Sequence, residues 1–432
     1  MRSTRTYVAV AAAVAAALAL AACSSSGSSS GSSSATSKVT LTWWSNANAN
    51  PLLGVFQKLM KSYHASHPNV SFSYVPIQNE QYDTKIQVAL QGNKAPDIFF
   101  QRGGGFMATQ VKSGELADLK PYDSSWIGEL GSLASAWQVE GGQYGVPYDQ
   151  HTVGFWYRKD VFARAGIKTP PATMPELEAD IAKLKAAGDA PIAVGSKDQW
   201  PDAFYWDYLA VRECSVTTLK TAVKAVSANY PCFLKAGNDL KAFMASKPFQ
   251  PAFLNTPAQV GAGSSAGMVA AGKAAMELQG DWDPSVMAAL VPGKKFLSEI
   301  GWFPFPSVPG APGNSQVLLG GGDGNSCSKS APEPACADFL AYLESTPSQR
   351  LLVSTANVGL PANPAASSAL TLPAEQQILQ AGKHTPYIQE YFDLAYPTNV
   401  GTALDSAVAN LFASKGTPQS IVTAIDQAAA RQ

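Results

Sequence analysis

The sequence predicts an α/β protein with an open, largely parallel β-sheet and a second, helix-rich lobe. Segments with strand-like alternation are followed by segments with helical spacing of apolar residues, and this strand–helix–strand rhythm is typical of parallel sheets. The chain has 432 residues, of which 46% are hydrophobic and 15% charged. It can therefore bury a sizeable core and is long enough for two lobes. The middle of the chain has few strand patterns, which indicates the helix-rich second lobe.

The first part of the folded chain predicts strands that feed helices. Apolar residues alternate in residues 38–44, and Pro51 then opens a helical pattern. Ligands of such sheets bind beyond the carboxyl ends of the strands, so the loops after Trp43 and Phe100 are candidate binding loops. The expected strands are 38–44, 70–75 and 97–100, and the expected helices are 52–63, 82–90, 174–188, 200–212, 236–245, 335–343, 404–412 and 421–429.

The charges of the chain are balanced, with 31 Lys and Arg against 32 Asp and Glu and a formal net charge of −1. A protein binds nucleic acids or anionic membrane surfaces through an excess of positive charge, which this chain lacks. Neither is an expected partner, and a neutral ligand is expected instead. Nine Trp and fifteen Tyr, many of them beside Gly, Pro or Asp, suggest a ligand that stacks on aromatic rings. Large rings are also ordinary core material, so for any single ring both ligand stacking and core packing remain possible roles.

The amino terminus has the pattern of an exported lipoprotein. Two arginines precede an Ala-rich apolar run over residues 7–22, which is short for a membrane span and typical of a signal peptide. The run ends in Leu-Ala-Ala-Cys23, which resembles a lipobox, so residues 1–23 are expected to be the signal and Cys23 the lipidated residue. Residues 24–38, nearly all Ser and Gly, are expected to be a flexible linker. The alternative is a plain secretory signal with an incidental cysteine.

Four of the five cysteines remain when Cys23 is set aside. Export places them in a compartment that permits disulfides, and four thiols allow three pairings. Cys214–Cys232 and Cys327–Cys336 are favoured because each pair closes one local loop. No spacing is CxxC and the four histidines lie elsewhere, so no metal site is expected.

Several motifs occur in a characteristic order along the mature chain. The most specific is Trp156-Tyr157-Arg158-Lys159-Asp160-Val161-Phe162, which follows Tyr144-Gly145-Val146-Pro147-Tyr148. The other matching segments are 67–70, 95–98, 114–119, 165–167, 170–171, 272–276, 279–282, 320–322 and 335–343. In this order they resemble the extracellular solute-binding proteins of family 1, the sugar receptors of ABC importers, which are similar in fold to maltose-binding protein.

The resemblance implies a two-lobe periplasmic-binding-protein-like fold of type II, with a ligand cleft between α/β lobes joined by hinge crossovers. It implies an N-lobe of residues 39–149 and 319–368 and a C-lobe of residues 150–318 and 369–432. The implied function is capture of a mono-, di- or short oligosaccharide outside the membrane and delivery to the permease subunits. The protein is expected to be a monomer without a cofactor, lipid-anchored at the extracellular face of a Gram-positive, actinobacterial membrane.

A pyranose has an apolar CH face and a rim of hydroxyls, so its site needs flat aromatic rings together with carboxylate, amide or guanidinium groups. Position in the resemblance selects the candidate ligand-binding residues Trp44, Asn46, Gln101, Arg102, Tyr148, Asp149, Asp198, Trp200, Asp281, Trp282, Gly322 and Asp323. Tyr387 and Tyr391 are further candidates. The alternative roles are packing for Trp126, Trp137 and Trp302, and capping of a turn for Asp281 or Asp283.

Two catalytic patterns fail on their context. Residues 263–267 match G-x-S-x-G but follow no buried strand, and residues 267–274 match a P-loop except that Ala274 replaces the Mg²⁺-binding Ser or Thr. The rival function is an exported glycoside hydrolase that uses two carboxylates among Asp149, Asp281 and Asp323. A receptor is favoured over an enzyme because a two-lobe crossover pattern suits closure around a ligand and its release.

Overall fold

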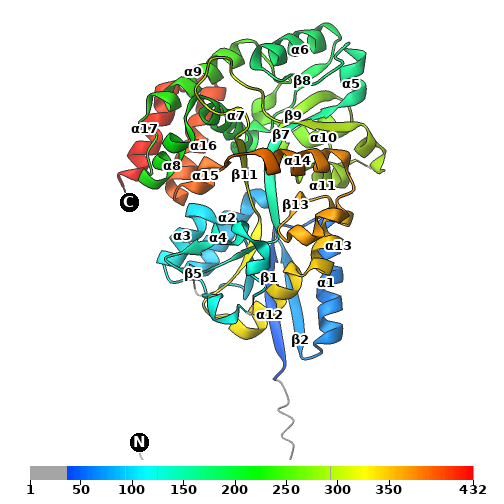
Figure 1. The fold of residues 1–432 in the computed structure, drawn as a ribbon, viewed down its shortest axis with the longest axis vertical. Helices are drawn as coiled ribbons and strands as arrows, with labels where there is room; N and C mark the ends of the chain where they lie inside the picture. The colour runs from blue at the N-terminus through cyan, green and yellow to red at the C-terminus, as the bar shows by residue number, and fades with distance from the viewer. Residues whose placement is uncertain (1–36, 93, 124, 292, 432) are drawn as a thin grey trace, which may run out of the picture. The chain divides into compact units, whose positions relative to one another are not determined.

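The computed structural model describes residues 37–92, 94–123, 125–291 and 293–431. The expected signal peptide, its Cys23 and residues 24–36 of the expected linker lie outside these residues. Residues 38–432 form the compact unit that carries the fold (Figure 1). Over the described part of the chain, no helix combines the length and the hydropathy that a membrane span requires.

The first sheet has five strands in the order β2-β1-β3-β12-β6. Its first three strands run parallel and its last two antiparallel to their neighbours, so the predicted strand–helix alternation is confirmed for this lobe. Figure 1 shows α1 and α13 on one side of the sheet and α2 and α3 on the other. The strands are β1 (Val39–Ser45), β2 (Val70–Pro76), β3 (Ile98–Gln101), β6 (Val146–Pro147) and β12 (Gly324–Cys327).

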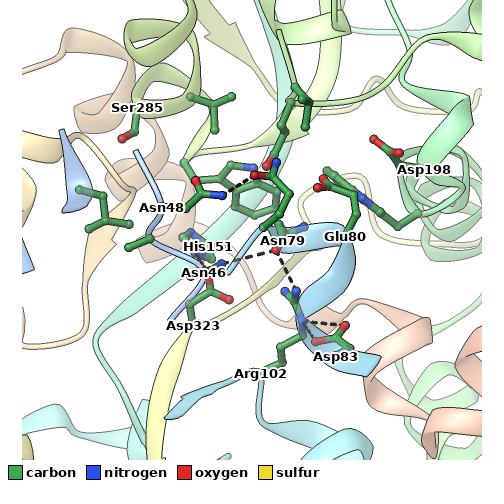
Figure 2. A pocket seen from close by; sticks show the side chains of 18 of the residues that line it. Asn46, Asn48, Asn79, Glu80, Asp83, Arg102, His151, Asp198, Ser285 and Asp323 are labelled. Carbon is green, nitrogen blue, oxygen red and sulfur yellow. Dashed lines mark hydrogen bonds and ion pairs between the residues drawn. The ribbon is translucent and has the colours of Figure 1, made fainter. Parts of the chain in front are cut away.

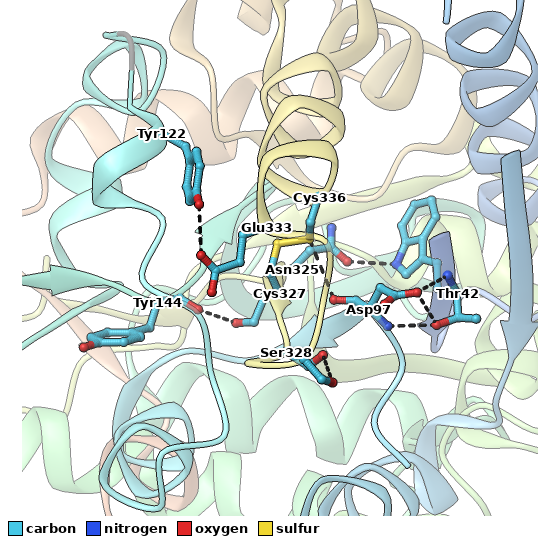
Figure 3. The surroundings of a disulfide bond; sticks show 12 residues. Thr42, Asp97, Tyr122, Tyr144, Asn325, Cys327, Ser328, Glu333 and Cys336 are labelled. Carbon is cyan, nitrogen blue, oxygen red and sulfur yellow. Dashed lines mark hydrogen bonds between the residues drawn. A yellow bond between two sulfur atoms is a disulfide. The ribbon is translucent and has the colours of Figure 1, made fainter. Parts of the chain in front are cut away.

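The helices of this lobe cover a core centred on Trp43. The alternation in β1 points Leu41 and Trp43 inward, both without exposed area, and the Trp43 ring contacts the rings of Phe56 and Phe339. Trp43 Nε1 donates a hydrogen bond to Asn325 Oδ1 at 3.0 Å, which ties β1 to β12 (Figure 3). The helices are α1 (Leu52–Ser66), α2 (Asn79–Gln91), α3 (Gly104–Lys112), α4 (Ser132–Ser135), α12 (Glu333–Glu344) and α13 (Thr346–Ala356).

The second sheet has seven strands and is built around one long strand, β7. The predicted lobe boundary at residues 149 and 150 lies at the start of this segment, where no strand was predicted, but the ten residues Asp149–Arg158 form a continuous strand that is buried along most of its length. β7 pairs with β9, β10, β11 and β13. The strands are β7, β8 (Ala190–Ile192), β9 (Ala274–Gly280), β10 (Ile300–Phe303), β11 (Leu318–Gly321), β13 (Leu360–Pro361) and β14 (Ile388–Glu390).

Helix α7 (Trp200–Glu213) lies at the centre of the second lobe, because every residue from Pro201 to Glu213 is buried. A helix that is buried on all sides must be covered by other elements, and here α9, α16 and β11 pack against it. The other helices are α5 (Lys159–Arg164), α6 (Met174–Ala186), α8 (Val216–Ala225), α9 (Pro231–Ala245), α10 (Ser265–Ala270), α11 (Asp283–Leu290), α14 (Pro373–His384), α15 (Phe392–Ala395), α16 (Thr398–Phe412) and α17 (Pro418–Ala429).

Three chain segments meet where the two sheets are connected. Tyr148 joins β6 to β7, and its backbone N–H donates to the carbonyl of Asp323, between β11 and β12, at 2.8 Å. The N–H of Ala362, after β13, donates to the carbonyl of Tyr148 at 3.3 Å. The lobe boundary expected at residue 319 falls inside β11, which pairs with β7 and β14 of the second sheet. The three segments therefore lie side by side, bound through their backbones.

Both favoured cysteine pairings are present. Cys214–Cys232 links the end of α7 to the start of α9 across 18 residues, and Cys327–Cys336 links β12 to α12 across nine. Figure 3 shows the second bridge beside Glu333, whose Oε2 accepts a hydrogen bond from the Tyr122 hydroxyl at 2.9 Å. Each bridge therefore joins two neighbouring elements of one lobe.

We expect the double variant Cys214→Ser/Cys232→Ser to lower the free energy of unfolding by about 3 kcal/mol, because an open loop of this length gains chain entropy in the unfolded state. Urea unfolding of the oxidised protein and the variant measures the difference. The matched control is the parent protein after reduction and alkylation, which should lose at least as much. A loss below about 0.5 kcal/mol in the double variant would contradict the prediction.

Candidate ligand-binding cleft

A cavity of about 690 Å³ lies between elements of the two sheets. On the first-lobe side it is lined by the loop after β1, by the start of α2 and by Arg102 just after β3. These are the carboxyl ends of parallel strands, where the sheet type predicts ligand binding. On the other side the start of α7, the start of α11 and the α15–α16 region line it. The cavity is therefore enclosed by side chains of both lobes.

The first-lobe wall of the cavity is a network of amides around Arg102. Arg102 Nη2 donates to Asn79 Oδ1 at 2.9 Å, and Nε pairs with Asp83 Oδ1 at 3.1 Å (Figure 2). Burial lowers the pKa of Arg102, but Asp83, Asp323 and Asp393 together raise it, and the pKa is raised overall. Asn46 donates to Asn79 at 3.4 Å, while Asn46 Oδ1 is buried without a hydrogen-bond partner among the residues that the structure describes. This wall offers fixed donors and acceptors to a polar ligand.

The second-lobe wall is aromatic. The ring of Trp282 lies 6.4 Å, between centroids, from the rings of Trp200, Phe204 and Tyr391. The indole N–H groups of both tryptophans and the Tyr391 hydroxyl are buried and lack partners within the described residues. A Cβ on Gly280 would lie 1.9 Å from the Trp282 ring, so only glycine lets this indole fold over the end of β9. The wall combines ring faces with available donors.

The floor of the cavity carries a buried histidine between aspartates. His151 Nδ1 lies 2.7 Å from Asp281 Oδ1, and Nε2 lies 3.1 Å from Asp149 Oδ1 and 3.4 Å from Asp323 Oδ2. Burial alone would lower the pKa of His151, but Asp149 and Asp281 raise it well above its usual range. Burial raises the pKa of Asp149 to about 7, although His151 opposes this. The His151 ring also contacts Trp282 edge to face, with centroids 4.7 Å apart.

The family model of bacterial extracellular solute-binding proteins matches residues 47–350, which is more than half of the chain. The chain belongs to this family. Two uncharacterized ABC transporter extracellular-binding proteins of Pyrococcus horikoshii are similar to it, one 30% identical over 162 residues and the other 25% identical over 252 residues. The matches cover 37% and 56% of this chain and span 37% and 54% of the length of these relatives.

Solved structures resemble the solute-binding protein over most of its length. One from work on xylan utilization by the thermophilic bacterium Caldanaerobius polysaccharolyticus has 26% sequence identity and a TM-score of 0.82, covering 90% of this chain and 99% of that chain. The predicted fold class, a two-lobe α/β binding protein of type II with a cleft and hinge crossovers, is thus confirmed.

Most of the residues that the sequence selected line the cleft of the solute-binding protein, and four do not. Trp44 packs against the first-lobe core, and Asp281 lies behind His151. Gln101 is fully buried, and its amide donates to Gln110 Oε1 at 2.7 Å. Gly322 lies against the backbone of Asp149, where a Cβ would come within 2.8 Å of the carbonyl. The selected residues that line the cavity are Asn46, Arg102, Tyr148, Asp149, Asp198, Trp200, Trp282 and Asp323.

Sequence reasoning missed several lining residues of the solute-binding protein. Tyr391, a further candidate, lines the cavity, whereas Tyr387 is not among the lining residues. Among the missed residues are His151, Asn48, Gln78, Asn79, Glu80, Asp83, Phe204, Ser285, Asp393 and Asp405. Asn79 and Asp83 could have been found as the first turn of the helix after the second strand. The others carry no motif that distinguishes them from ordinary surface residues.

One buried acid close to the cleft makes the stability depend on pH. Burial raises the pKa of Asp202, on α7, to about 8, although Ser196 donates a hydrogen bond to it at 2.6 Å. In the unfolded chain this carboxyl titrates near pKa 3.9. Between about pH 4 and pH 8 the folded state therefore keeps a proton that the unfolded state has released, and stability falls as pH rises.

We expect this group to lower the free energy of unfolding by about 1.4 kcal/mol per pH unit within that window. Urea unfolding at about pH 5.5 and pH 7.5 measures the slope, and Asp202→Asn should make it shallower because the amide does not titrate. Asp338→Asn, at an exposed site on α12, is the matched control and should leave the slope unchanged. Equal slopes for Asp202→Asn and the parent protein would contradict the assignment.

Proposed function

We propose that this protein captures a carbohydrate outside the cytoplasm and delivers it to the permease subunits of an ABC importer. The observation that carries the proposal is the asymmetry of the cleft. One wall presents the rings of Trp200 and Trp282, and the other presents the amides of Asn46 and Asn79 with Arg102. A pyranose has the matching pair of surfaces, an apolar face for the rings and hydroxyls for the amides.

The relatives support the carbohydrate class and the transport role. Those from Pyrococcus horikoshii are named as ABC transporter binding proteins, and the Caldanaerobius structure comes from work on xylan utilization. A cavity of about 690 Å³ has room for a mono-, di- or short oligosaccharide, and its several rings favour more than one sugar unit. We propose a receptor without catalysis, since the two-lobe architecture suits closure and release.

Finer features of the proposal follow from the sequence. We propose lipidation at Cys23 after removal of the signal, a linker over residues 24–38, and a monomer tethered at the extracellular face of a Gram-positive, actinobacterial membrane. The proposed lobes are residues 39–149 with 319–368 and residues 150–318 with 369–432. The lipobox and the Ser/Gly run support the anchor and the linker, and the crossing at Tyr148 supports the first lobe boundary.

The test is a thermal-shift screen of residues 38–432 against xylo-oligosaccharides, chito-oligosaccharides, lactose and monosaccharides, followed by calorimetry of the hits. A ligand at one hundred times its dissociation constant should stabilise the fold by about 2.7 kcal/mol. Chromatography then shows whether the hit is recovered intact. A shift with intact recovery supports a receptor. Cleavage of the sugar would favour the hydrolase, and no shift across the panel would overturn the carbohydrate assignment.

A further inference from the structure

We propose that Asp149, His151 and Asp323 bind one divalent transition-metal cation, with Zn²⁺ as the expected ion, at the floor of the cleft. The three residues come from β7 and from the crossing between β11 and β12, and all three line the cavity. Each offers one ligand atom, and these atoms all lie within 4.8 Å of one another. Metal binding is a property of the protein alone. Only its consequence for sugar binding rests on the proposed function.

The spacing of the ligand atoms fits a tetrahedral ion. His151 Nε2 lies 3.1 Å from Asp149 Oδ1 and 3.4 Å from Asp323 Oδ2. In a tetrahedral zinc site with bonds of about 2.0–2.2 Å, two ligand atoms are about 3.3–3.6 Å apart. In Figure 2 the labelled His151 and Asp323 side chains lie next to each other in the cavity. The two separations that involve His151 are thus close to the tetrahedral values, and the third lies within 4.8 Å, so an ion can bind if the two carboxylates draw together around it.

His151 is held with Nε2 available for a metal. Its Nδ1 lies 2.7 Å from Asp281 Oδ1, so Nδ1 can keep its proton and donate it to Asp281 when a metal ion displaces the proton of Nε2. Nε2 is buried and makes no hydrogen bond within the described residues. Zinc-binding histidines almost always have a carboxylate or carbonyl on the other ring nitrogen. What separates the cluster from an ordinary group of acids is this buried nitrogen, which faces Asp149 Oδ1 at 3.1 Å and Asp323 Oδ2 at 3.4 Å without a well-formed hydrogen bond to either.

The surroundings of the cluster are rigid. The backbone N–H of Asp323 donates to Asp149 Oδ1 at 2.7 Å, which holds the two carboxylate-bearing segments together. Gly359 passes so close that a Cβ there would lie 2.7 Å from Asp281 Oδ1 and 2.9 Å from His151 Nδ1. The positions of the imidazole and its aspartate are thus fixed from both sides, as a preformed metal site requires.

Charge also favours a dication. Asp149 and Asp281 are almost completely buried and Asp323 is partly buried, and all three face His151. Arg102, the arginine that lines the cavity, is paired with Asp83 at 3.1 Å and also interacts electrostatically with Asp323. One protonated imidazole compensates a single negative charge, whereas a divalent ion compensates two, and buried carboxylates are costly without compensation.

The cavity side of the ion would remain open. Three protein ligands leave a fourth tetrahedral position, as in zinc sites that bind water or a substrate. The Trp282 ring lies 4.7 Å from the His151 ring, between centroids. A sugar stacked on Trp282 would therefore bring a hydroxyl to the open position, and the ion would strengthen sugar binding.

The experiment is a titration of the purified, chelator-treated protein with ZnCl₂ in the absence of sugar, followed by calorimetry and by elemental analysis after desalting. We expect one Zn²⁺ per chain, and Co²⁺ in its place should give the visible absorption of a tetrahedral site. His151→Asn and Asp323→Asn should abolish this stoichiometric binding. Asp281→Asn, which removes only the partner of His151, should weaken it about 10- to 100-fold.

The matched control is His64→Asn, which removes a histidine on α1 far along the chain from the cluster and should leave the stoichiometry unchanged. Circular dichroism melts of each variant separate loss of metal from loss of fold. Equal zinc uptake by the parent protein, His151→Asn and Asp323→Asn would overturn the site, and so would no uptake by the folded parent. His151 would then be a protonated partner of the aspartates. A sugar screen run with and without Zn²⁺ tests the proposed function separately, because zinc uptake does not depend on it.

Discussion

Replacement of Arg212 by methionine is expected to lower the free energy of unfolding by about 3–5 kcal/mol. Arg212 is 1% exposed, and its guanidinium donates to the carbonyls of Phe305 at 2.7 Å, Pro306 at 3.2 Å and Val317 at 2.8 Å. Methionine fills part of the space but leaves three buried carbonyl groups without a donor, and each costs about 1–3 kcal/mol. Urea unfolding measures the loss.

The control for this experiment is Arg164→Met on α5. That side chain is 53% exposed and pairs with Asp189 at 2.8 Å, and exposed pairs contribute little, so its removal should change stability by less than about 1 kcal/mol. Similar losses of unfolding free energy in Arg212→Met and Arg164→Met would contradict the prediction, because the carbonyl groups around Arg212 would then have other hydrogen-bond donors. Burial also lowers the pKa of Arg212 to about 10, which is still high enough to keep the guanidinium charged at neutral pH.

Replacement of Trp282 by alanine is expected to weaken binding of the sugar found in the screen about 30- to 100-fold, because the main stacking surface and an indole donor are lost together. The indole N–H makes no hydrogen bond within the described residues, and we expect the bound ligand to supply its acceptor. Isothermal calorimetry measures the dissociation constant. Trp282→Phe keeps a ring but loses the donor, and should therefore bind with intermediate affinity.

Trp126→Ala is the matched control for Trp282→Ala. Trp126 packs against the first-lobe core, and its indole donates to the carbonyl of Tyr122 at 3.3 Å, away from the cavity-lining residues. Its loss should leave affinity unchanged. An unchanged dissociation constant in a folded Trp282→Ala variant would mean that the sugar does not stack on this ring.

The first lobe was the part of the fold that the sequence predicted best. Its first strand, β1, alternates because one of its two faces is buried, as Leu41 and Trp43 show. The second lobe was predicted less completely. β7 is buried along most of its length, so it shows no alternation to read, and the pairing of its first residues with β11 and β13 depends on segments far along the chain.

The candidate site was predicted in outline. Asn46, Arg102 and Trp282 were selected by their positions after a strand or in the family resemblance, and all three line one cavity. The selection of Trp44 and Gln101 shows the limit of such reasoning, because a one-residue step along a strand or loop turns a side chain from the cavity into the core. His151 was missed because two of its three partners, Asp281 and Asp323, are 130 and 172 residues away, and no local pattern joins them to it.

The three backbone segments that connect the lobes have a mechanical consequence. Tyr148, Asp323 and Ala362 are joined edge to edge by backbone hydrogen bonds, so the connection is a narrow ribbon instead of three separate tethers. A ribbon bends readily across its flat face but resists shear and splaying within its plane. Opening of the lobes should therefore follow a single coordinate, and one distance, measured between a pair of spin labels placed on the two lobes, should describe the whole motion.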